Sequence, residues 1–87
     1  MAIWRIETCK LEAGYKSHAS IYKLIREGLW TNPVRLGIRS VGWPSEEITT
    51  ICKARIAGKS DDQIRALVQA LHLKRESNLT AHLEEAV

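Results

Sequence analysis

Histidines and cysteines are the residues of this chain that could bind a metal or act as nucleophiles. The three histidines, His18, His72 and His82, show neither HExxH nor HxxxH spacing. The two cysteines, Cys9 and Cys52, lie far apart without the CxxC spacing of a zinc site, and Cys9 has no neighbouring histidine. The sequence therefore predicts no metal site and no disulfide scaffold. His72 and His82 are expected to be surface residues, whereas His18 faces either DNA or solvent.

Two pairs of adjacent carboxylates, Glu46–Glu47 and Asp61–Asp62, could in principle perform acid–base chemistry. Each pair begins an expected helix, where negative side chains interact favourably with the positive end of the helix dipole, so a structural role accounts for both pairs. The chain also contains no Gly-rich phosphate loop and no GxSxG motif. We therefore expect no enzyme, with no catalytic residues and no cofactor.

The chain of 87 residues carries a net charge of +3, and its positive charge is concentrated in the first half. Up to Pro44, seven lysines and arginines face three glutamates, whereas from Ser45 onward six basic residues face seven acidic ones. Segregated positive charge on a small domain is typical of a protein with a polyanionic partner, because phosphate contacts release counterions. The charge pattern indicates nucleic acid as the partner.

Length and composition predict one compact, cytoplasmic domain. Hydrophobic residues make up 45% of the chain and charged residues 26%, which is typical of a globular protein with a core. The longest apolar run, residues 1–4, is far too short to span a membrane, and the pattern of a signal peptide is missing. We expect no membrane contact.

The first half of the chain predicts a helix-turn-helix. Thr8 is a plausible N-cap for a short helix over Cys9–Ala13, which Gly14 ends. Ser17 begins a second helix, which closes at Gly28. Its apolar residues follow helical spacing, at Ile21, Leu24 and Ile25. A short helix, a tight connection and an amphipathic helix are typical of this motif, and an ordinary helical hairpin in a core is the alternative.

A short β-hairpin, the expected wing, follows the helix-turn-helix. Val34–Leu36 and Arg39–Trp43 form its strands, with a turn at residues 37–38, and Pro44 ends the run. Strict alternation places Arg39 on the same side as Trp43, so an outward Arg39 requires an irregular turn. Trp43 itself is expected in the core.

Two helices are expected after the hairpin. Ser45 caps the first, which ends near Gly58 and carries an apolar stripe of Ile48, Ile51, Cys52 and Ile56. A capping box, Ser60–Gln63, begins the second, with a stripe of Ile64, Leu67, Val68 and Leu71. The polar tail from Glu76 is either helical or frayed.

We expect a DNA-binding domain over residues 1–57 and a helical extension packed on it over residues 58–87. This fold-back, favoured over pairing with another copy, predicts a monomer in free solution, with multimers only along DNA.

The outward face of the second helix suits the major groove of DNA. At about 100° per residue, Ala19, Lys23 and Arg26 lie opposite Ile21, with Tyr22 at the margin. Lysine or arginine can reach guanine or phosphate, and alanine can contact a thymine methyl group. The helix start near Ser17 can offer N–H groups to a phosphate. The alternative is a solvated helix face with two cations.

The chain resembles the AlpA-type prophage regulators, which are small winged-helix proteins related to phage excisionases and, more distantly, to MerR-type domains. The residues that carry the resemblance are Gly14–Gly28 (GYKSHASIYKLIREG), Pro33–Gly37 (PVRLG), Arg39, Val41–Trp43 (VGW) and Ser45–Ile48 (SEEI). It covers about residues 6–57. The family commonly has Phe-Pro where Trp30-Thr31 stands, and often Trp where Ile51 stands. Both replacements keep an apolar side chain, so the fold is expected to be retained.

The resemblance implies a mainly α fold with a small β-hairpin, a winged helix-turn-helix plus C-terminal helices, that binds double-stranded DNA. It implies that Lys16, Ser17, His18, Ser20 and Lys23 meet the major groove and that Arg35 and Arg39 meet the backbone or the minor groove. The expected function is that of a transcriptional regulator or an excisionase-like recombination directionality factor, with a recombinase or a second regulator as a further partner. The alternative is a protein-interaction module that docks on another regulator through its basic face or its C-terminal helix.

Overall fold

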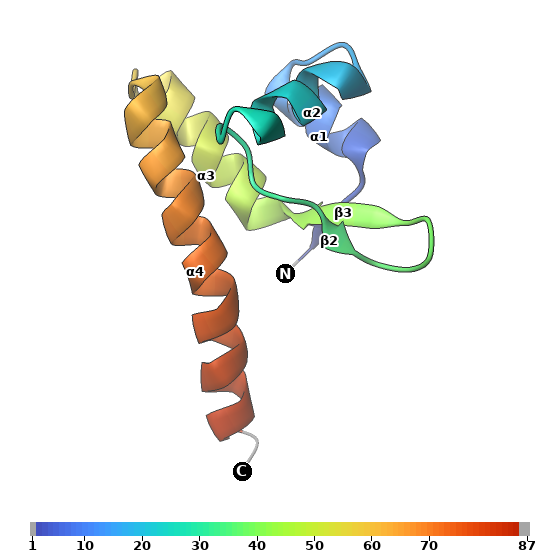
Figure 1. Ribbon diagram of the computed structural model, residues 1–87, viewed down its shortest axis with the longest axis vertical. Helices are drawn as coiled ribbons and strands as arrows, with labels where there is room; N and C mark the ends of the chain where they lie inside the picture. The colour runs from blue at the N-terminus through green and yellow to red at the C-terminus, as the bar shows by residue number, and fades with distance from the viewer. Residues whose placement is uncertain (1, 86–87) are drawn as a thin grey trace.

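Helices dominate residues 2–85, the part of the chain that the computed structural model describes, and a small antiparallel sheet completes it (Figure 1). The elements in chain order are β1 (Ile3–Trp4), α1 (Ile6–Ala13), α2 (His18–Arg26), β2 (Val34–Arg35), β3 (Val41–Pro44), α3 (Ser45–Ile56) and α4 (Asp61–Glu85). This confirms the predicted fold class, mainly α with a small β-hairpin, in an arrangement compatible with a winged helix.

The two short N-terminal helices follow the predicted pattern except at their start. α1 begins at Ile6 rather than at Cys9, and the Cys9 N–H already donates to the Arg5 carbonyl at 3.1 Å, so Thr8 lies inside the helix and the expected cap was wrong. Ile6 packs against the core, which extends the helix by this turn. Gly14 ends α1 with a left-handed φ of 80°, as predicted.

The sheet has three strands in the order β1-β3-β2, so the predicted hairpin gains an unpredicted N-terminal strand. Trp4 pairs with Trp43 across β1 and β3, and Arg35 pairs with Val41 across β2 and β3. Gly42 permits this close packing, because a Cβ there would lie only 2.7 Å from the Cγ2 atom of Ile3. The packing of β1 against β3 therefore depends on a glycine at position 42.

Helix α3 follows β3 without a loop, which makes the predicted Ser45 cap wrong. Pro44, the last residue of the strand, takes the N-cap position, and Ser45 is the first helical residue. The Ser45 N–H donates to the Ala2 carbonyl at 2.8 Å, so the N-terminal strand supplies the acceptor. At the other end Ile56 is 87% exposed, and its expected place in the apolar stripe was also wrong.

The core lies between the four helices and the sheet. Its fully buried larger side chains are Trp30, Trp43, Ile21, Ile48, Ile51, Ile64 and Val68. The Trp43 indole N–H donates to the Thr31 carbonyl at 2.8 Å, which satisfies its one polar group inside the core. The predicted core position of Trp43 is confirmed.

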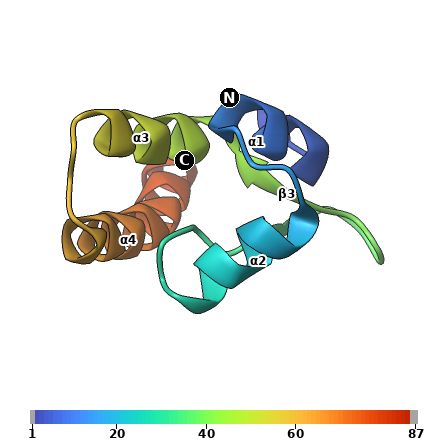
Figure 2. The same cartoon turned by 90° about the horizontal axis from the view of Figure 1, so that it is seen from above.

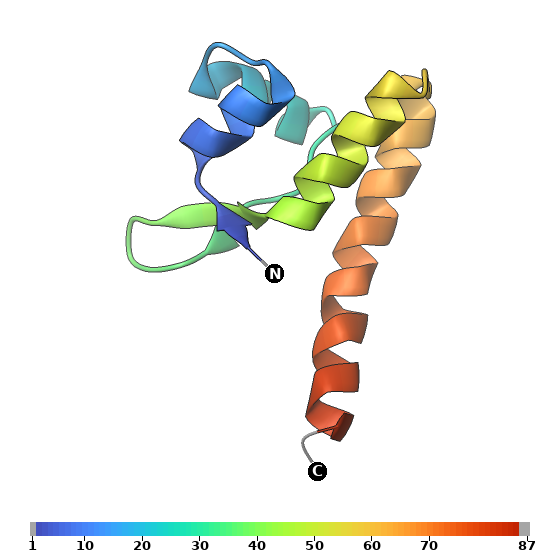
Figure 3. The same cartoon turned by 180° about the vertical axis from the view of Figure 1, so that it is seen from behind.

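Helix α4 runs antiparallel to α3 and continues well past the rest of the molecule (Figures 1 and 3). Its predicted capping box is confirmed, since the Ser60 and Gln63 side chains each accept the other's backbone N–H, at 3.2 and 2.9 Å. Ile64 and Val68 are buried, so this stripe is not free to dock on another regulator. The tail is helical to Glu85, and residues 86–87 lie outside the described part. The division at residue 57 remains a prediction.

Candidate nucleic-acid interface

Helix α2 presents the basic face that the sequence predicted. Ile21 is buried on its inner side, whereas Ala19, Lys23 and Arg26 are exposed. Tyr22 is 39% exposed at the margin of this face. The helix therefore has one side in the core and one small, cationic side in solvent, which is the arrangement that a groove-binding helix requires.

Two serines, Ser17 and Ser20, form hydrogen bonds at the start of α2. The Ser17 hydroxyl accepts the Ser20 N–H at 3.2 Å, which confirms the predicted cap, and the two hydroxyl oxygens lie 2.9 Å apart. Lys16 and Ser17 are exposed, and Ser20 is half-buried. The capping bond leaves the first backbone N–H groups of α2 available to an anion.

Glu7 of α1 lies beside the start of α2, a neighbour that the sequence analysis missed. Its Oε1 atom is 2.6 Å from the His18 Nε2 atom, and its Oε2 atom accepts from Lys10 at 3.3 Å. The hydrogen bonds from His18 and then from Lys10 lower the pKa of Glu7. The lowered pKa keeps this carboxylate ionised, and the Lys10 ammonium group beside it partly offsets its negative charge.

The hairpin projects away from α4, beside the helix-turn-helix (Figures 1 and 2). Its turn is irregular, because the Leu36 and Gly37 N–H groups both donate to the Ser40 carbonyl, at 2.8 and 3.3 Å. Arg35 and Arg39 are exposed. The irregular turn is the condition under which Arg39 could point outward.

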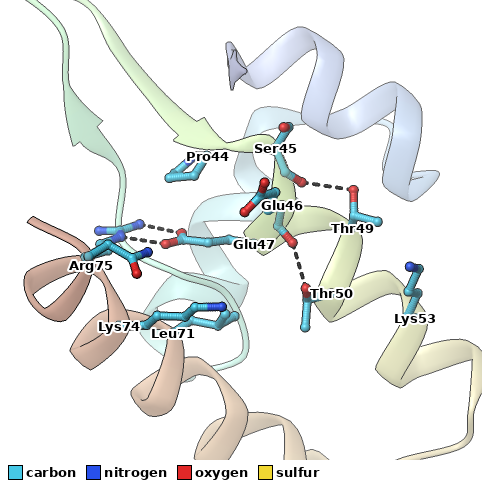
Figure 4. A pocket seen from close by; sticks show the side chains of 11 residues that line it. Pro44, Ser45, Glu46, Glu47, Thr49, Thr50, Lys53, Leu71, Lys74 and Arg75 are labelled. Carbon is cyan, nitrogen blue, oxygen red and sulfur yellow. Dashed lines mark hydrogen bonds and ion pairs between the residues drawn. The ribbon is translucent and has the colours of Figure 1, made fainter. Parts of the chain in front are cut away.

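Two long-range contacts of α4 correct two sequence interpretations. Glu47 was assigned to the helix dipole alone, but it is 6% exposed and accepts two hydrogen bonds from Arg75, at 2.7 and 2.6 Å (Figure 4). His72 was expected to be a plain surface residue, but its Nε2 atom accepts the Asn32 N–H at 3.0 Å. Both contacts join residues far apart in sequence, so no local pattern could reveal them.

A groove beside the Glu47–Arg75 pair has a volume of about 460 Å³. Its lining residues are Pro44, Ser45, Glu46, Glu47, Thr49, Thr50, Lys53, Leu71, Lys74, Arg75 and Asn78. The Thr49 and Thr50 hydroxyls donate to carbonyls one turn earlier, at 2.9 and 2.7 Å. The charged residues of the lining include both glutamates and basic side chains.

The described residues contain no cluster of three or more His, Cys, Asp or Glu side chains that could hold a metal. Both cysteines are free thiols. Burial raises the pKa of Cys9 to about 11, and burial also raises the pKa of Cys52. Both thiols therefore stay protonated and weakly nucleophilic at neutral pH.

A family model described as Prophage CP4-57 regulatory protein (AlpA) matches residues 13–56. The chain belongs to the AlpA family of prophage regulatory proteins. The match runs from the last residue of α1 to the last residue of α3 and so contains α2 and the hairpin. It confirms the resemblance to AlpA-type regulators, and α4 lies beyond the matched AlpA segment. Comparisons with curated proteins and with solved structures gave no match. Among residues 2–85, no helix combines the length and apolar character needed to cross a membrane.

Proposed function

We propose that this AlpA-family protein binds double-stranded DNA through α2 and the hairpin and regulates prophage functions from that site. The observation that carries the proposal is the exposed face of α2, with Ala19, Lys23 and Arg26, opposite a buried Ile21. The alternative, a solvated helix face with two cations, does not account for a second basic element nearby. Here an exposed hairpin with two arginines projects beside the same helix-turn-helix. That combination supports DNA over the alternative.

The proposed contacts divide into two groups. α2 and the residues before it enter the major groove, where lysine and arginine reach guanine or phosphate and Ala19 meets a thymine methyl group. The hairpin lies against the backbone or the minor groove. The full proposed set is Lys16, Ser17, His18, Ala19, Ser20, Lys23, Arg26, Arg35 and Arg39. Ser17 contributes through the helix start that it caps, since its hydroxyl is already bonded to Ser20.

The protein acts without catalysis in this proposal. It occupies, and bends, sites near a promoter as a transcriptional regulator, or near an attachment site as an excisionase-like factor that directs a recombinase. Because its proposed partners, DNA and a recombinase, are cytoplasmic, the protein acts in the cytoplasm in this proposal. Residues 1–57 form the reading unit, and residues 58–87 form the extension packed on it.

The proposal is tested by selecting bound sequences from a random DNA pool and measuring affinity for the selected duplex over a salt titration. Lys23→Ala with Arg26→Ala removes two contacts and is expected to flatten the slope of log K against log salt by about 1.8, at roughly 0.9 per phosphate. Lys53→Ala with Lys59→Ala is the matched control, because both lysines are exposed outside the proposed face. Equal slopes for the two double variants would refute the assignment of α2 to the groove.

A further inference from the structure

Helix α4 holds both ends of the segment that joins α2 to the hairpin. At the α2 end, the Arg65 Nε atom donates to the Glu27 carbonyl at 2.8 Å. At the hairpin end, Asn32 is held twice: its N–H donates to the His72 Nε2 atom at 3.0 Å, and its carbonyl accepts from the Arg75 Nη2 atom at 2.8 Å. Figure 2 shows the loop after α2 running beside α4.

These contacts satisfy backbone groups that would otherwise lack a partner in a helix or a strand. Glu27 is the C-cap residue of α2, and the last carbonyls of a helix receive no hydrogen bond from within that helix. Gly28 then turns the chain with a φ of 76°, and the Arg65 stem packs 3.5 Å from where a Cβ would stand. Asn32 lies two residues before β2. The spacing between α2 and the hairpin is therefore fixed from outside the segment.

The side chains of α4 that make these contacts are themselves anchored. Arg75 bonds Glu47 of α3 with two hydrogen bonds, and Arg65 bonds Asp62 at 2.9 Å. The body of α4 is fixed to the core by the buried Ile64. A shift of α4 relative to α3 would therefore move both ends of the joining segment.

We propose that Arg65, His72 and Arg75 are positioning residues that hold α2 and the hairpin at the spacing that DNA recognition requires. The inference rests on the proposed DNA-binding function and adds a control element to it. All three residues lie beyond residues 13–56, so the element is supplied by the part of the chain outside the AlpA match. They act through the backbone of Glu27 and Asn32.

The His72 contact gives this element a pH dependence. Only a neutral imidazole can accept the Asn32 N–H, because both ring nitrogens of the charged form are donors. Burial and the adjacent Arg75 lower the pKa of His72 from the ordinary 6.5, while Glu47 of α3 opposes the shift. The contact is fully present above pH 6.5 and is lost as the pH falls through the lowered folded-state value. DNA affinity is expected to weaken over the same range.

The first test compares the wild type with His72→Gln, in which an amide oxygen keeps an acceptor that does not titrate. The dissociation constant for the selected duplex is measured by fluorescence anisotropy between pH 7.5 and 5. The ratio of the two constants cancels any pH effect that is common to both proteins. We expect a ratio near one at pH 7.5 and a loss of about fivefold for the wild type at low pH, a usual size for coupling between sites. A ratio independent of pH would overturn the role of His72.

The second test compares Arg65→Met with Arg55→Met. Each variant removes one guanidinium group and one ion pair with an aspartate at the start of α4, Asp62 or Asp61. Arg65 also donates to the Glu27 backbone carbonyl, which is the contact under test. We expect Arg65→Met to raise the dissociation constant about fivefold more than Arg55→Met, with the salt slope unchanged. Equal effects, or a slope that falls by about 0.9 as for a direct phosphate contact, would overturn the positioning role.

Two further readouts separate the possible failures. Exchange of the Asn32 amide hydrogen, measured without DNA, should accelerate in His72→Leu and stay slow in His72→Gln, and equal rates would contradict the contact itself. A wild type that binds no selected duplex would refute the proposed function and this inference with it. A wild type that binds DNA, with Arg65→Met equal to Arg55→Met and His72→Gln equal to the wild type at every pH from 7.5 to 5, would refute the inference alone.

Discussion

Arg75→Met is expected to lower the free energy of unfolding by about 3 kcal/mol, because it leaves a buried carboxylate without its partner. Methionine keeps much of the apolar stem of arginine but carries no donor. Glu47, only 6% exposed, would lose both of its hydrogen bonds from Arg75. The Asn32 carbonyl would lose its donor as well.

The size of the effect follows from the burial of the two partners. Breaking a buried ion pair from one side costs roughly 3–5 kcal/mol. The Arg75 side chain is 28% exposed, so water reaches the site, and we expect the low end of this range. In a domain of this size each 1 kcal/mol shifts the melting temperature by about 4–8 °C, which gives a fall of about 12–24 °C.

Urea and thermal unfolding, followed by circular dichroism, measure this loss. Arg55→Met is the control, because its exposed pair with Asp61 is worth at most about 1 kcal/mol. Adding Glu47→Leu to Arg75→Met should restore most of the stability, since removing both partners of a buried pair is often nearly neutral. A loss below about 1 kcal/mol, or a double variant as unstable as Arg75→Met alone, would refute the reasoning.

Three further outcomes are expected. Trp43→Ala should destabilise the protein by roughly 3–5 kcal/mol in a thermal melt, as for other buried aromatics, and an unchanged melting temperature would contradict its core role. Truncation after Glu76 removes the end of α4, whose residues 77–84 are exposed, so melting temperature and DNA affinity should stay close to those of the whole chain, and a tenfold weaker affinity would show that the tail participates. Sedimentation at about 10–100 μM should show a monomer, because Ile64 and Val68 of α4 are already buried within one chain. A dimer with a dissociation constant of about 10–100 μM would have a free energy near −5.4 to −6.8 kcal/mol and would be visible. A stable dimer abolished by Leu67→Glu would show that α4 pairs between copies.

Most features that the sequence predicted correctly depend on neighbouring residues, although the Thr8 and Ser45 caps, which are also local, were wrong. Ser17 as a cap, Gly14 as a helix end and the Ser60–Gln63 capping box each involve groups within a few positions, and the structure contains all three. The fold class and the exposed face of α2 followed from helical spacing in the same way. Local patterns therefore located the elements and the candidate interface.

The sequence could not predict contacts between distant residues. Glu47 and Arg75 are 28 positions apart, and Asn32 and His72 are 40 apart. Glu47 and His72 therefore had simpler local explanations, as a helix-dipole residue and a surface residue. The strand β1 has two residues, too few for an alternating pattern, and it forms because β3 offers a free edge. Such contacts are set by how the elements pack, which no short window of sequence encodes.

The pairing of β1 with the far end of β3 also sets the order in which this protein can fold during synthesis. Ile3 has to wait for Pro44 to emerge, which at about 5–20 residues per second takes roughly 2–8 s. Helices form in about a microsecond and close contacts with each other long before then. On the ribosome, α1 and α2 therefore spend seconds without β3, whose Trp43 belongs to the same buried cluster as Cys9 and Ile21.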